Sequence, residues 1–378
     1  MKIAVNTRLL IRNRLEGIGW FTFETLKRIT LNHPEHEFIF LFDRPYNREF
    51  IFADNVTPVV IHIQARHPVL WYLFFEWGVA RTLKKYKADL FLSTDGWVSL
   101  KTKVPTINVI HDLNFVHYPE FIKPLVRLYY KKYFKLFAQK PIRLATVSEY
   151  TKNDIIKNYG VDAEKIDVVY NGSSSLYTPL TEKKKKEIKE QFSGDAPYFI
   201  YIGAIHYRKN LTGLFKAFDL FKSRNQTNHK LVIVGAKKWW KGEIEKVYND
   251  MLFNEDVIFL GRLETLELNH VLSSAEALMY ISFFEGFGIP IIEAFNAGTP
   301  VITSNTTSMP EVAGDAAEYV DPFSIESITE AMEKVATNKN HRLELIKKGF
   351  KQKEKFSWDI TAQKLWNTIE KGMAEVVQ

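Results

Sequence analysis

Residues 282–293 read Ser-Phe-Phe-Glu-Gly-Phe-Gly-Ile-Pro-Ile-Ile-Glu, and they predict a buried strand that turns directly into a helix. The apolar run 277–281 comes just before and is typical of a parallel strand. Residues 285–288 then form the turn at the carboxyl end of that strand. Pro290 fits the first position of a helix, where its missing N–H costs nothing. Gly298 ends the helix.

This layout predicts an anion site. The amides of Gly286, Phe287 and Gly288 and the positive end of the helix point at one place, which suits a phosphate. Two carboxylates, Glu285 and Glu293, frame the same place and can accept hydrogen bonds from hydroxyls, as an acidic residue does with a ribose in dinucleotide folds. Phosphate, ribose and a further polyol together indicate a nucleotide sugar. The alternative is a carboxylate that only complements the helix dipole.

The same residues carry a family resemblance. Glu285 and Glu293, seven residues apart with glycines between them, resemble the signature of retaining glycosyltransferases of family 4, which have the GT-B fold. The similarity continues through 293–303 (Glu-Ala-Phe-Asn-Ala-Gly-Thr-Pro-Val-Ile-Thr) and 309–315 (Met-Pro-Glu-Val-Ala-Gly-Asp). The resemblance implies that Glu293 holds the ribose and Glu285 the donor sugar.

Bulk composition indicates a two-domain globular protein. The chain has 378 residues, no cysteine and a formal net charge of +7, so we expect two cores, no disulfides and anionic partners. The first residues are strand-like rather than typical of a signal peptide. No apolar run approaches the roughly 20 residues of a spanning helix. We therefore expect a cytoplasmic location.

Short apolar strands alternate with helical stretches along the chain, which favours α/β structure with doubly wound parallel sheets. The predicted strands of the first half are 3–5, 38–42, 59–63, 90–92, 106–110 and 144–147, with helices at 20–31, 70–86, 124–138 and 148–158. A second series of strands comprises 166–169, 198–202, 231–234, 257–260, 277–281, 301–303 and 318–320.

The pattern predicts two Rossmann-like domains facing across a cleft, with ligands at the carboxyl ends of the strands. The polar stretch that begins at 171–175 indicates the joint, so the domains are 1–170 and 171–355. Residues 181–191, with four lysines in a row, predict a solvated helix. Residues 356–378 match the family's last helix, which returns to the N-terminal domain.

Two further loops are candidates for the phosphates. Gly17 and Gly19 precede a helix predicted from Trp20, and glycines let backbone approach a diphosphate; an ordinary loop is the alternative. Arg208 and Lys209 follow strand 198–202, at the carboxyl edge where two cations can stabilise a departing phosphate. A surface basic pair is the alternative. In the resemblance, the glycines and Lys209 contact the phosphates, with Arg208 beside them.

His111 ends strand 106–110, and a structural hydrogen-bonded histidine is one interpretation. In the resemblance, His111 sits against the donor sugar. We expect it to bond a sugar hydroxyl or a nearby backbone carbonyl rather than act as a base. Ser148, after strand 144–147, reads as a helix N-cap. No Asp-x-Asp, His-x-x-Glu-His or cysteine set is present, so we expect no metal and no cofactor beyond the donor.

Residues 121–143 hold seven basic residues and no acidic one, interleaved with aromatic and aliphatic residues. Arg127, Lys131 and Lys135 recur every fourth residue and share one helix face. This pattern is typical of a helix on an anionic membrane surface, or of a packed helix with a solvated basic face. Aromatic residues at 71–75 and Trp77 would suit a saccharide or lipid-linked acceptor if exposed.

The sequence therefore predicts a retaining hexosyltransferase. Its donor is a nucleotide sugar, GDP-mannose or a UDP-sugar, and its acceptor is a saccharide or lipid-linked saccharide of cell-surface polysaccharide synthesis. One alternative is a sugar-nucleotide epimerase of the GT-B type. The other is a non-catalytic protein that binds nucleotides or nucleic acid through the basic helix, although that helix lacks a nucleic-acid motif, and we expect no nucleic-acid partner.

Overall fold

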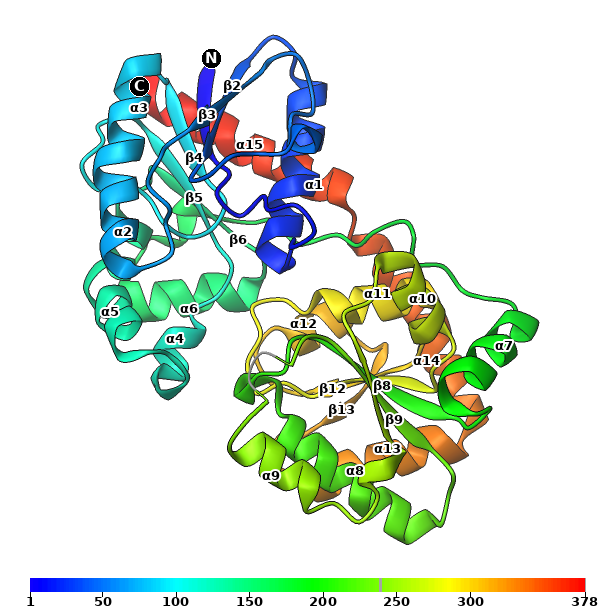
Figure 1. Ribbon diagram of the computed structural model, residues 1–378. Helices are drawn as coiled ribbons and strands as arrows, with labels where there is room; N and C mark the ends of the chain where they lie inside the picture. The colour runs from blue at the N-terminus through cyan, green and yellow to red at the C-terminus, as the bar shows by residue number, and fades with distance from the viewer. Residues whose placement is uncertain (238–239, 378) are drawn as a thin grey trace. The chain divides into compact units, whose positions relative to one another are not determined.

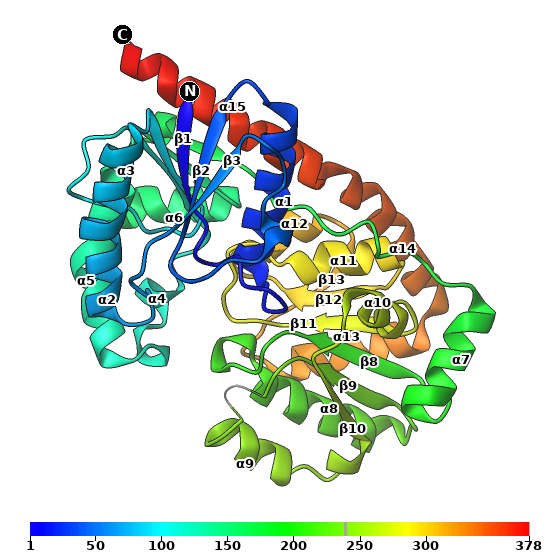
Figure 2. The same ribbon diagram turned by 45° about the horizontal axis from the view of Figure 1, so that its top comes forward.

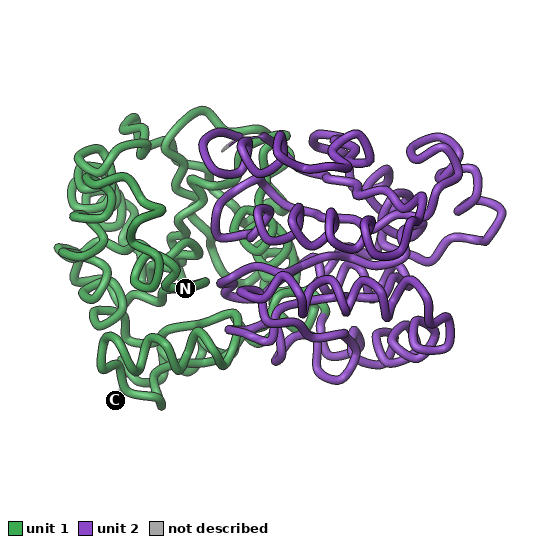
Figure 3. Tube along the Cα trace, turned by 90° about the horizontal axis from the view of Figure 1, so that it is seen from below, with its two compact units in different colours: residues 1–172, 357–378 green, residues 173–356 purple. Residues whose placement is uncertain are grey.

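The computed structural model describes residues 1–237 and 240–377, which form two compact units. Unit 1 contains residues 1–172 together with the C-terminal segment from Ser357, and unit 2 contains residues 173–356 (Figure 3). Each unit is a parallel β-sheet with helices on its faces, which confirms the expected α/β class.

Unit 1 has seven parallel strands in the order β3-β2-β1-β4-β5-β6-β7. The chain order reverses between β1 and β4, and ligands of such sheets bind at the carboxyl ends beside that reversal. The strands are β1 (Lys2–Asn6), β2 (Glu37–Phe42), β3 (Val56–Val60), β4 (Leu90–Ser93), β5 (Thr106–Ile110), β6 (Arg143–Thr146) and β7 (Ile166–Val168).

Helices cover both faces of this sheet (Figures 1 and 2). They are α1 (Gly17–Asn32), α2 (Pro68–Leu73), the π-helical turn η2 (Phe74–Val79), α3 (Ala80–Tyr86), α4 (Asn114–His117), α5 (Pro124–Gln139), α6 (Glu149–Tyr159) and α15 (Trp358–Val377). Helices α1 and α15 pack against each other. A core of large apolar side chains joins α2, η2, α3, α5 and α6 to the sheet.

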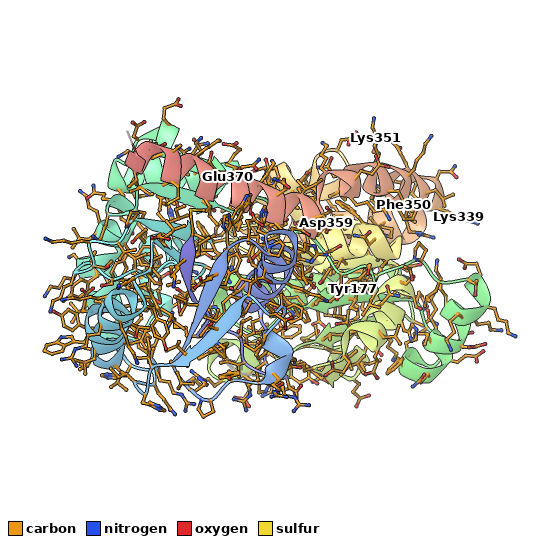
Figure 4. All side chains as sticks on the ribbon, turned by 90° about the horizontal axis from the view of Figure 1, so that it is seen from above. Tyr177, Lys339, Phe350, Lys351, Asp359 and Glu370 are labelled. Atoms are coloured by element: carbon orange, nitrogen blue, oxygen red, sulfur yellow. The ribbon has the colours of Figure 1, made fainter. Side chains whose placement is uncertain are left out.

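The last helix, α15, is tied to unit 1 by polar contacts. The Arg28 Nε of α1 donates to Asp359 Oδ1 over 2.6 Å, and the Thr361 hydroxyl donates to the Tyr170 carbonyl over 2.6 Å. Asp359 and Glu370 lie along this helix in Figure 4. Unit 1 therefore contains a helix that the chain forms only after it has completed unit 2.

Three predicted elements of unit 1 were placed wrongly. Helix α1 begins at Gly17 rather than near Trp20. Strand β3 is 56–60 rather than 59–63; it contains Pro58, which is tolerated because β3 is an edge strand. The helix predicted at 70–86 is one helical run from Pro68, interrupted by the π-helical turn η2.

Unit 2 has six parallel strands in the order β10-β9-β8-β11-β12-β13. The chain order reverses between β8 and β11. The strands are β8 (Tyr198–Ile202), β9 (Lys230–Val234), β10 (Val257–Gly261), β11 (Ala277–Tyr280), β12 (Val301–Ser304) and β13 (Ala317–Val320). The predicted strand 166–169 does not open this series: it is β7, at the edge of the first sheet.

The helices of unit 2 again lie on both faces of the sheet, with α8 and α13 packed together and α11 beside α12 and α14 (Figures 1 and 2). They are α7 (Glu182–Ser193), α8 (Leu211–Asn225), α9 (Glu243–Asn249), α10 (Thr265–Ser273), α11 (Ile289–Ala297), α12 (Met309–Ala313), α13 (Ile325–Thr337) and α14 (Lys339–Gln352). Figure 4 marks Lys339, Phe350 and Lys351 on α14. Helix α7 is the predicted lysine-rich helix, and Thr181 caps it.

We predict that Gly172→Ala destabilises unit 1. A Cβ at this position would lie 2.3 Å from the backbone nitrogen of Trp358, at the start of α15. Because backbone must shift to admit it, we expect a loss of about 1–3 kcal/mol in the free energy of unfolding, measured by denaturant titration. The control is Gly372→Ala inside α15, whose Cβ meets side-chain ends of Ile142 and Ile107 at 3.0 and 3.2 Å. Equal stability for the two variants would contradict the close backbone approach.

Candidate functional site

Two loops meet at the carboxyl edge of the second sheet. Strands β8 and β11 are parallel neighbours, so their following loops emerge side by side. The first loop forms a 3₁₀ turn, η5 (Tyr207–Lys209), and leads into α8. The second loop carries Glu285 and leads into α11. The parallel pairing thus brings together charged residues that lie far apart in sequence.

The Glu285 carboxylate lies between two cations. Its Oε2 is 2.8 Å from Arg208 Nη1 and its Oε1 is 2.5 Å from Lys209 Nζ. The exposed fractions of the side chains are only 18 % for Arg208, 14 % for Lys209 and 9 % for Glu285. Lys209 also donates to the Tyr280 hydroxyl over 3.0 Å and lies 4.9 Å from the centre of its ring. We call Arg208, Lys209 and Glu285 the charged triad.

The triad keeps a net positive charge at neutral pH. Burial raises the pKa of Glu285, but Arg208 and Lys209 outweigh it and hold that pKa at about 2. His206 caps η5, and burial together with the same two cations lowers its pKa to about 4. Two cations, one carboxylate and a neutral imidazole leave an excess of one positive charge, which favours an anionic ligand.

Backbone contacts fix the cations. The Phe283 N–H donates to the Arg208 carbonyl over 2.9 Å, and the Arg208 guanidinium donates to the Phe284 carbonyl. Asn210 sits in the left-handed region at φ 56° and caps α8 by accepting from the Gly213 N–H. Its amide donates to the Pro322 carbonyl over 2.7 Å. The contacts of Arg208 with Phe283 and Phe284 therefore hold the two loops in register.

The turn at 285–287 rests on residues that the sequence interpretation missed. The Ser308 hydroxyl donates to the carbonyls of Glu285 and Phe287 over 2.9 and 3.0 Å. The Glu285 N–H donates to the Thr307 hydroxyl over 3.2 Å. The signal that would have found them is the polar run 305–308, Asn-Thr-Thr-Ser, which directly follows strand β12.

Helix α11 begins at Ile289, so Pro290 occupies its second position rather than the predicted first. The residue that makes the corner is Gly288, whose φ of 104° a side chain would strain. Gly286, Phe287 and Gly288 thus precede a helix of nine residues that ends, as predicted, at Gly298. In the first turn of α11, Pro290 has no N–H and the Ile291 N–H donates to the Gly288 carbonyl over 3.0 Å. The positive end of the helix dipole still suits a negatively charged group.

Glu293 lies in the second turn of α11, half-buried, and its environment differs from that of Glu285. Burial raises its pKa to about 7, and a hydrogen bond with Tyr177 opposes this rise. Tyr177, labelled in Figure 4, is itself buried. Burial and the Glu293 charge raise the Tyr177 pKa. Glu293 is therefore a carboxyl group that exchanges its proton near neutral pH.

Gly17 and Gly19 belong to unit 1, where they form the first turn of α1 rather than a loop before it. The Trp20 N–H is bonded to the Glu16 carbonyl over 2.9 Å. A Cβ on Gly17 would meet nothing within 4 Å, whereas one on Gly19 would lie 3.2 Å from the Leu9 carbonyl. Gly19 therefore allows the Leu9 carbonyl to come close to α1, whereas the space beside Gly17 holds no atom within 4 Å of a Cβ.

His111 lies at the carboxyl end of β5 in unit 1. Its Nε2 is 2.8 Å from the Thr94 carbonyl, which is one of the two partners expected for it. Burial lowers its pKa, so the ring is neutral at pH 7, with Nε2 donating to the carbonyl and Nδ1 left as an acceptor. Ser148 caps α6 as predicted, since its hydroxyl accepts from the Thr151 N–H over 3.0 Å.

Neither a metal cluster nor a membrane span is found in the part of the chain that the structure describes. Within residues 1–237 and 240–377, no three His, Cys, Asp or Glu side chains are grouped so as to hold a metal ion. Over the same residues, no helix is long and apolar enough to cross a bilayer.

The chain is similar to known glycosyltransferases in both halves. Residues 182–352 match the family described as Glycosyl transferases group 1, and residues 27–173 match Glycosyltransferase Family 4. The chain is 30 % identical to O-antigen chain mannosyltransferase RfbU of Salmonella typhimurium over 71 % of each chain. It is 26 % identical to O-antigen chain mannosyltransferase B of Escherichia coli, over 95 % of this chain and 97 % of that protein.

The fold has solved counterparts. Sucrose-phosphate synthase from Thermosynechococcus elongatus superposes with a TM-score of 0.81 at 16 % identity, over 99 % of both chains. WaaG, a glycosyltransferase involved in lipopolysaccharide biosynthesis, superposes with a TM-score of 0.75 at 15 % identity, over 96 % of this chain and 98 % of the other. These likenesses establish the GT-B fold.

We predict that Glu285→Gln lowers the free energy of unfolding by about 3–5 kcal/mol at pH 7, because it leaves two half-buried cations without their carboxylate. Glu285 has a folded pKa of about 2, below its ordinary 4.5. Its contribution is therefore present above pH 4.5 and is lost as pH falls towards 2. The stability gap between the native protein and the variant should narrow over that window in urea titrations.

The control for this prediction is Glu326→Gln, which removes an exposed carboxylate from an ion pair with Arg224. It should change stability little at any pH. A gap for Glu285→Gln that is constant from pH 5 to pH 2.5 would contradict the depressed pKa.

Proposed function

Because the chain is a glycosyltransferase of the group 1 and family 4 kind, we propose that it moves mannose from GDP-mannose to a hydroxyl of a saccharide or lipid-linked saccharide. The reaction retains the anomeric configuration. The choice of mannose rests on the two relatives named above, both O-antigen chain mannosyltransferases. A UDP-sugar is the second donor to test.

The charged triad is the observation that carries this proposal. Cleavage of a sugar–diphosphate bond leaves negative charge on the departing oxygen, and fixed cations stabilise that charge more strongly when they are shielded from water. Arg208 and Lys209 are both nearly buried and are fixed by Glu285. Their excess positive charge supplies what a metal ion supplies elsewhere.

Glu285 has two roles in this mechanism. Without donor it neutralises one of the two cations and keeps both in place. With donor bound, Arg208 and Lys209 donate some of their hydrogen bonds to the diphosphate instead of to Glu285. The Glu285 carboxylate then faces the sugar. Positive charge develops on the sugar as the bond breaks, and a carboxylate close by stabilises it.

The remaining groups bind the donor. The amides of Gly286, Phe287 and Gly288 and the start of α11 receive the diphosphate. Glu293, as a carboxylate, accepts hydrogen bonds from the ribose hydroxyls. Within unit 1, the backbone at Gly17 and Gly19 can receive a phosphate, and His111 Nδ1 can accept a hydrogen bond from a sugar hydroxyl.

The chemical step needs no protein nucleophile. The bond between the anomeric carbon and the phosphate oxygen breaks while a bond to the acceptor oxygen forms on the same face of the sugar. The acceptor hydroxyl gives its proton to a departing phosphate oxygen. The protein's part is to hold the two substrates and to stabilise charge.

The experiment that tests the function offers a panel of nucleotide sugars to the purified protein with oligosaccharide and lipid-linked acceptors. Mannosylated product of retained configuration, accompanied by free GDP, supports the proposal. A change in the donor sugar without transfer would indicate an epimerase. Binding of the donor or of nucleic acid without any reaction would indicate a non-catalytic protein.

We predict that Lys209→Ala lowers kcat by a factor on the order of 10²–10³, the usual cost of losing a charge partner of the transition state. The measurement is steady-state transfer from the preferred donor. The control is Lys216→Ala on the exposed side of α8, seven residues further along the chain. Near-normal turnover of Lys209→Ala would remove Lys209 from the mechanism.

We also predict that the two glutamates separate binding from turnover. Glu293→Gln should weaken GDP and donor alike by about tenfold, because the ribose does not change during reaction. Glu285→Gln should leave GDP affinity equal or tighter, since the cations lose their internal partner, and should depress kcat. Calorimetry with GDP and steady-state kinetics measure the two effects. If Glu285→Gln weakened GDP binding while Glu293→Gln lowered only kcat, the roles assigned to the two glutamates would be reversed.

A further inference from the structure

Two helical segments of unit 1 expose large apolar side chains to solvent. The first is the run formed by α2 and η2, and the second is α5. At about 100° per helical residue, each set falls within an arc of about 100° and so lies in a stripe along one helix face. The exposed side chains are Val69 (57 %), Leu70 (37 %), Leu73 (37 %) and Trp77 (49 %) on the first, and Leu125 (48 %), Leu128 (64 %) and Leu136 (44 %) on the second.

The two segments lie side by side (Figures 1 and 2). Trp71 of α2 stacks on Tyr130 of α5, with ring centres 6.2 Å apart and planes inclined by 12°. Tyr72 meets Tyr133 with ring centres 6.1 Å apart. These inward contacts hold the segments together, so their apolar stripes share one side of unit 1. We call this side the docking face.

Within segments 66–86 and 121–143, which hold most cations of the docking face, no carboxylate is exposed, and the exposed Glu120 directly precedes the second segment. Segment 121–143 contains no acidic residue, and segment 66–86 contains one, Glu76. Glu76 is buried, and its carboxylate accepts from the N–H groups of Leu100 and Lys101 over 2.7 and 2.8 Å. The exposed cations are Arg81, Lys101, Lys123, Arg127, Lys131, Lys132 and Lys135.

A strip of alternating cations and rings joins the two stripes. Lys132 lies 5.0 Å from the ring centre of Tyr133 on α5. Lys101 lies 5.7 Å from the ring of Tyr72 and 5.4 Å from that of Trp77, on α2 and η2. Amphipathic rings beside lysines are typical of the boundary between water and acyl chains.

We propose that the docking face binds the surface of an anionic phospholipid bilayer, with its leucines and Trp77 at the acyl boundary and its cations on the headgroup phosphates. The combination of charges and protruding apolar groups carries the inference. Nucleic acid would engage the cations and leave Leu128 and Trp77 in water, whereas a bilayer engages both. The contact deepens the proposed function, because it places unit 1 where a lipid-linked acceptor is found.

The test is sedimentation with vesicles of phosphatidylcholine containing phosphatidylglycerol, against vesicles of phosphatidylcholine alone. We expect the native protein to bind only the anionic vesicles. Lys131→Gln/Lys135→Gln should weaken binding by about 25-fold, at about fivefold for each lysine near an anionic surface. Leu128→Gln should weaken it by about tenfold, through the lost burial of one leucine.

Matched controls lie in unit 2. Lys183→Gln/Lys186→Gln removes two exposed lysines of α7, and Leu252→Gln replaces a leucine that is 80 % exposed. Both should bind vesicles as the native protein does. The proposal is overturned if the native protein ignores anionic vesicles, if the controls lose binding equally, or if binding is indifferent to Leu128→Gln and competed away by duplex DNA.

Vesicle binding tests the docking face, and sugar transfer tests the proposed function, so the two proposals can be contradicted independently. The docking-face variants should transfer mannose to a water-soluble acceptor at the native rate, because none of their residues belongs to the donor machinery. Absence of vesicle binding with intact transfer would overturn the docking face alone. Vesicle binding without transfer would overturn the proposed function alone.

Discussion

The proposed donor site depends on one buried carboxylate held between two cations. Removing Glu285 from water is costly, and only the close approach of Arg208 and Lys209 offsets that cost. The carboxylate in turn orders the cations, together with the contacts that Arg208 makes with the Phe284 carbonyl and Lys209 with the Tyr280 hydroxyl. The charges of the three side chains sum to +1, and because these side chains are largely shielded from water, attraction for a phosphate is stronger there than at an exposed pair.

Parallel pairing of β8 and β11 makes this arrangement possible. The strands are neighbours across the reversal of chain order, so two loops that are remote in sequence emerge at the same edge. Asn210 anchors one loop through the Pro322 carbonyl, and Ser308 holds the other through the carbonyls of Glu285 and Phe287. The glycine corner at Gly288 then starts α11 directly behind the triad. The parallel strand pairing and the three charged side chains therefore favour anion binding at the same edge of the second sheet.

Most strands were predictable because their apolar runs are short, buried and bounded by polar residues. Strands β5 and β8 have the predicted bounds. The start of α1 at Gly17 was missed because glycines usually indicate a loop, and the place of β7 was missed because sheet membership depends on pairing across the chain.

The candidate site residues were found from their positions at strand ends, but their mutual contacts were not. A carboxylate expected to face only a sugar proved to be paired with both cations. Thr307, Ser308 and Tyr177 escaped notice because their roles are hydrogen bonds to distant backbone or side chains. Such contacts follow from three-dimensional packing, which local sequence patterns do not encode.

The most direct test of the central claim is a crystal structure of the protein with GDP bound. We predict phosphate oxygens within hydrogen-bonding distance, about 2.7–3.2 Å, of the Arg208 guanidinium and of Lys209 Nζ, with the Gly286–Gly288 amides beside them. A diphosphate bound elsewhere, with both ion pairs of Glu285 unchanged, would contradict the claim that this charged triad is the donor site.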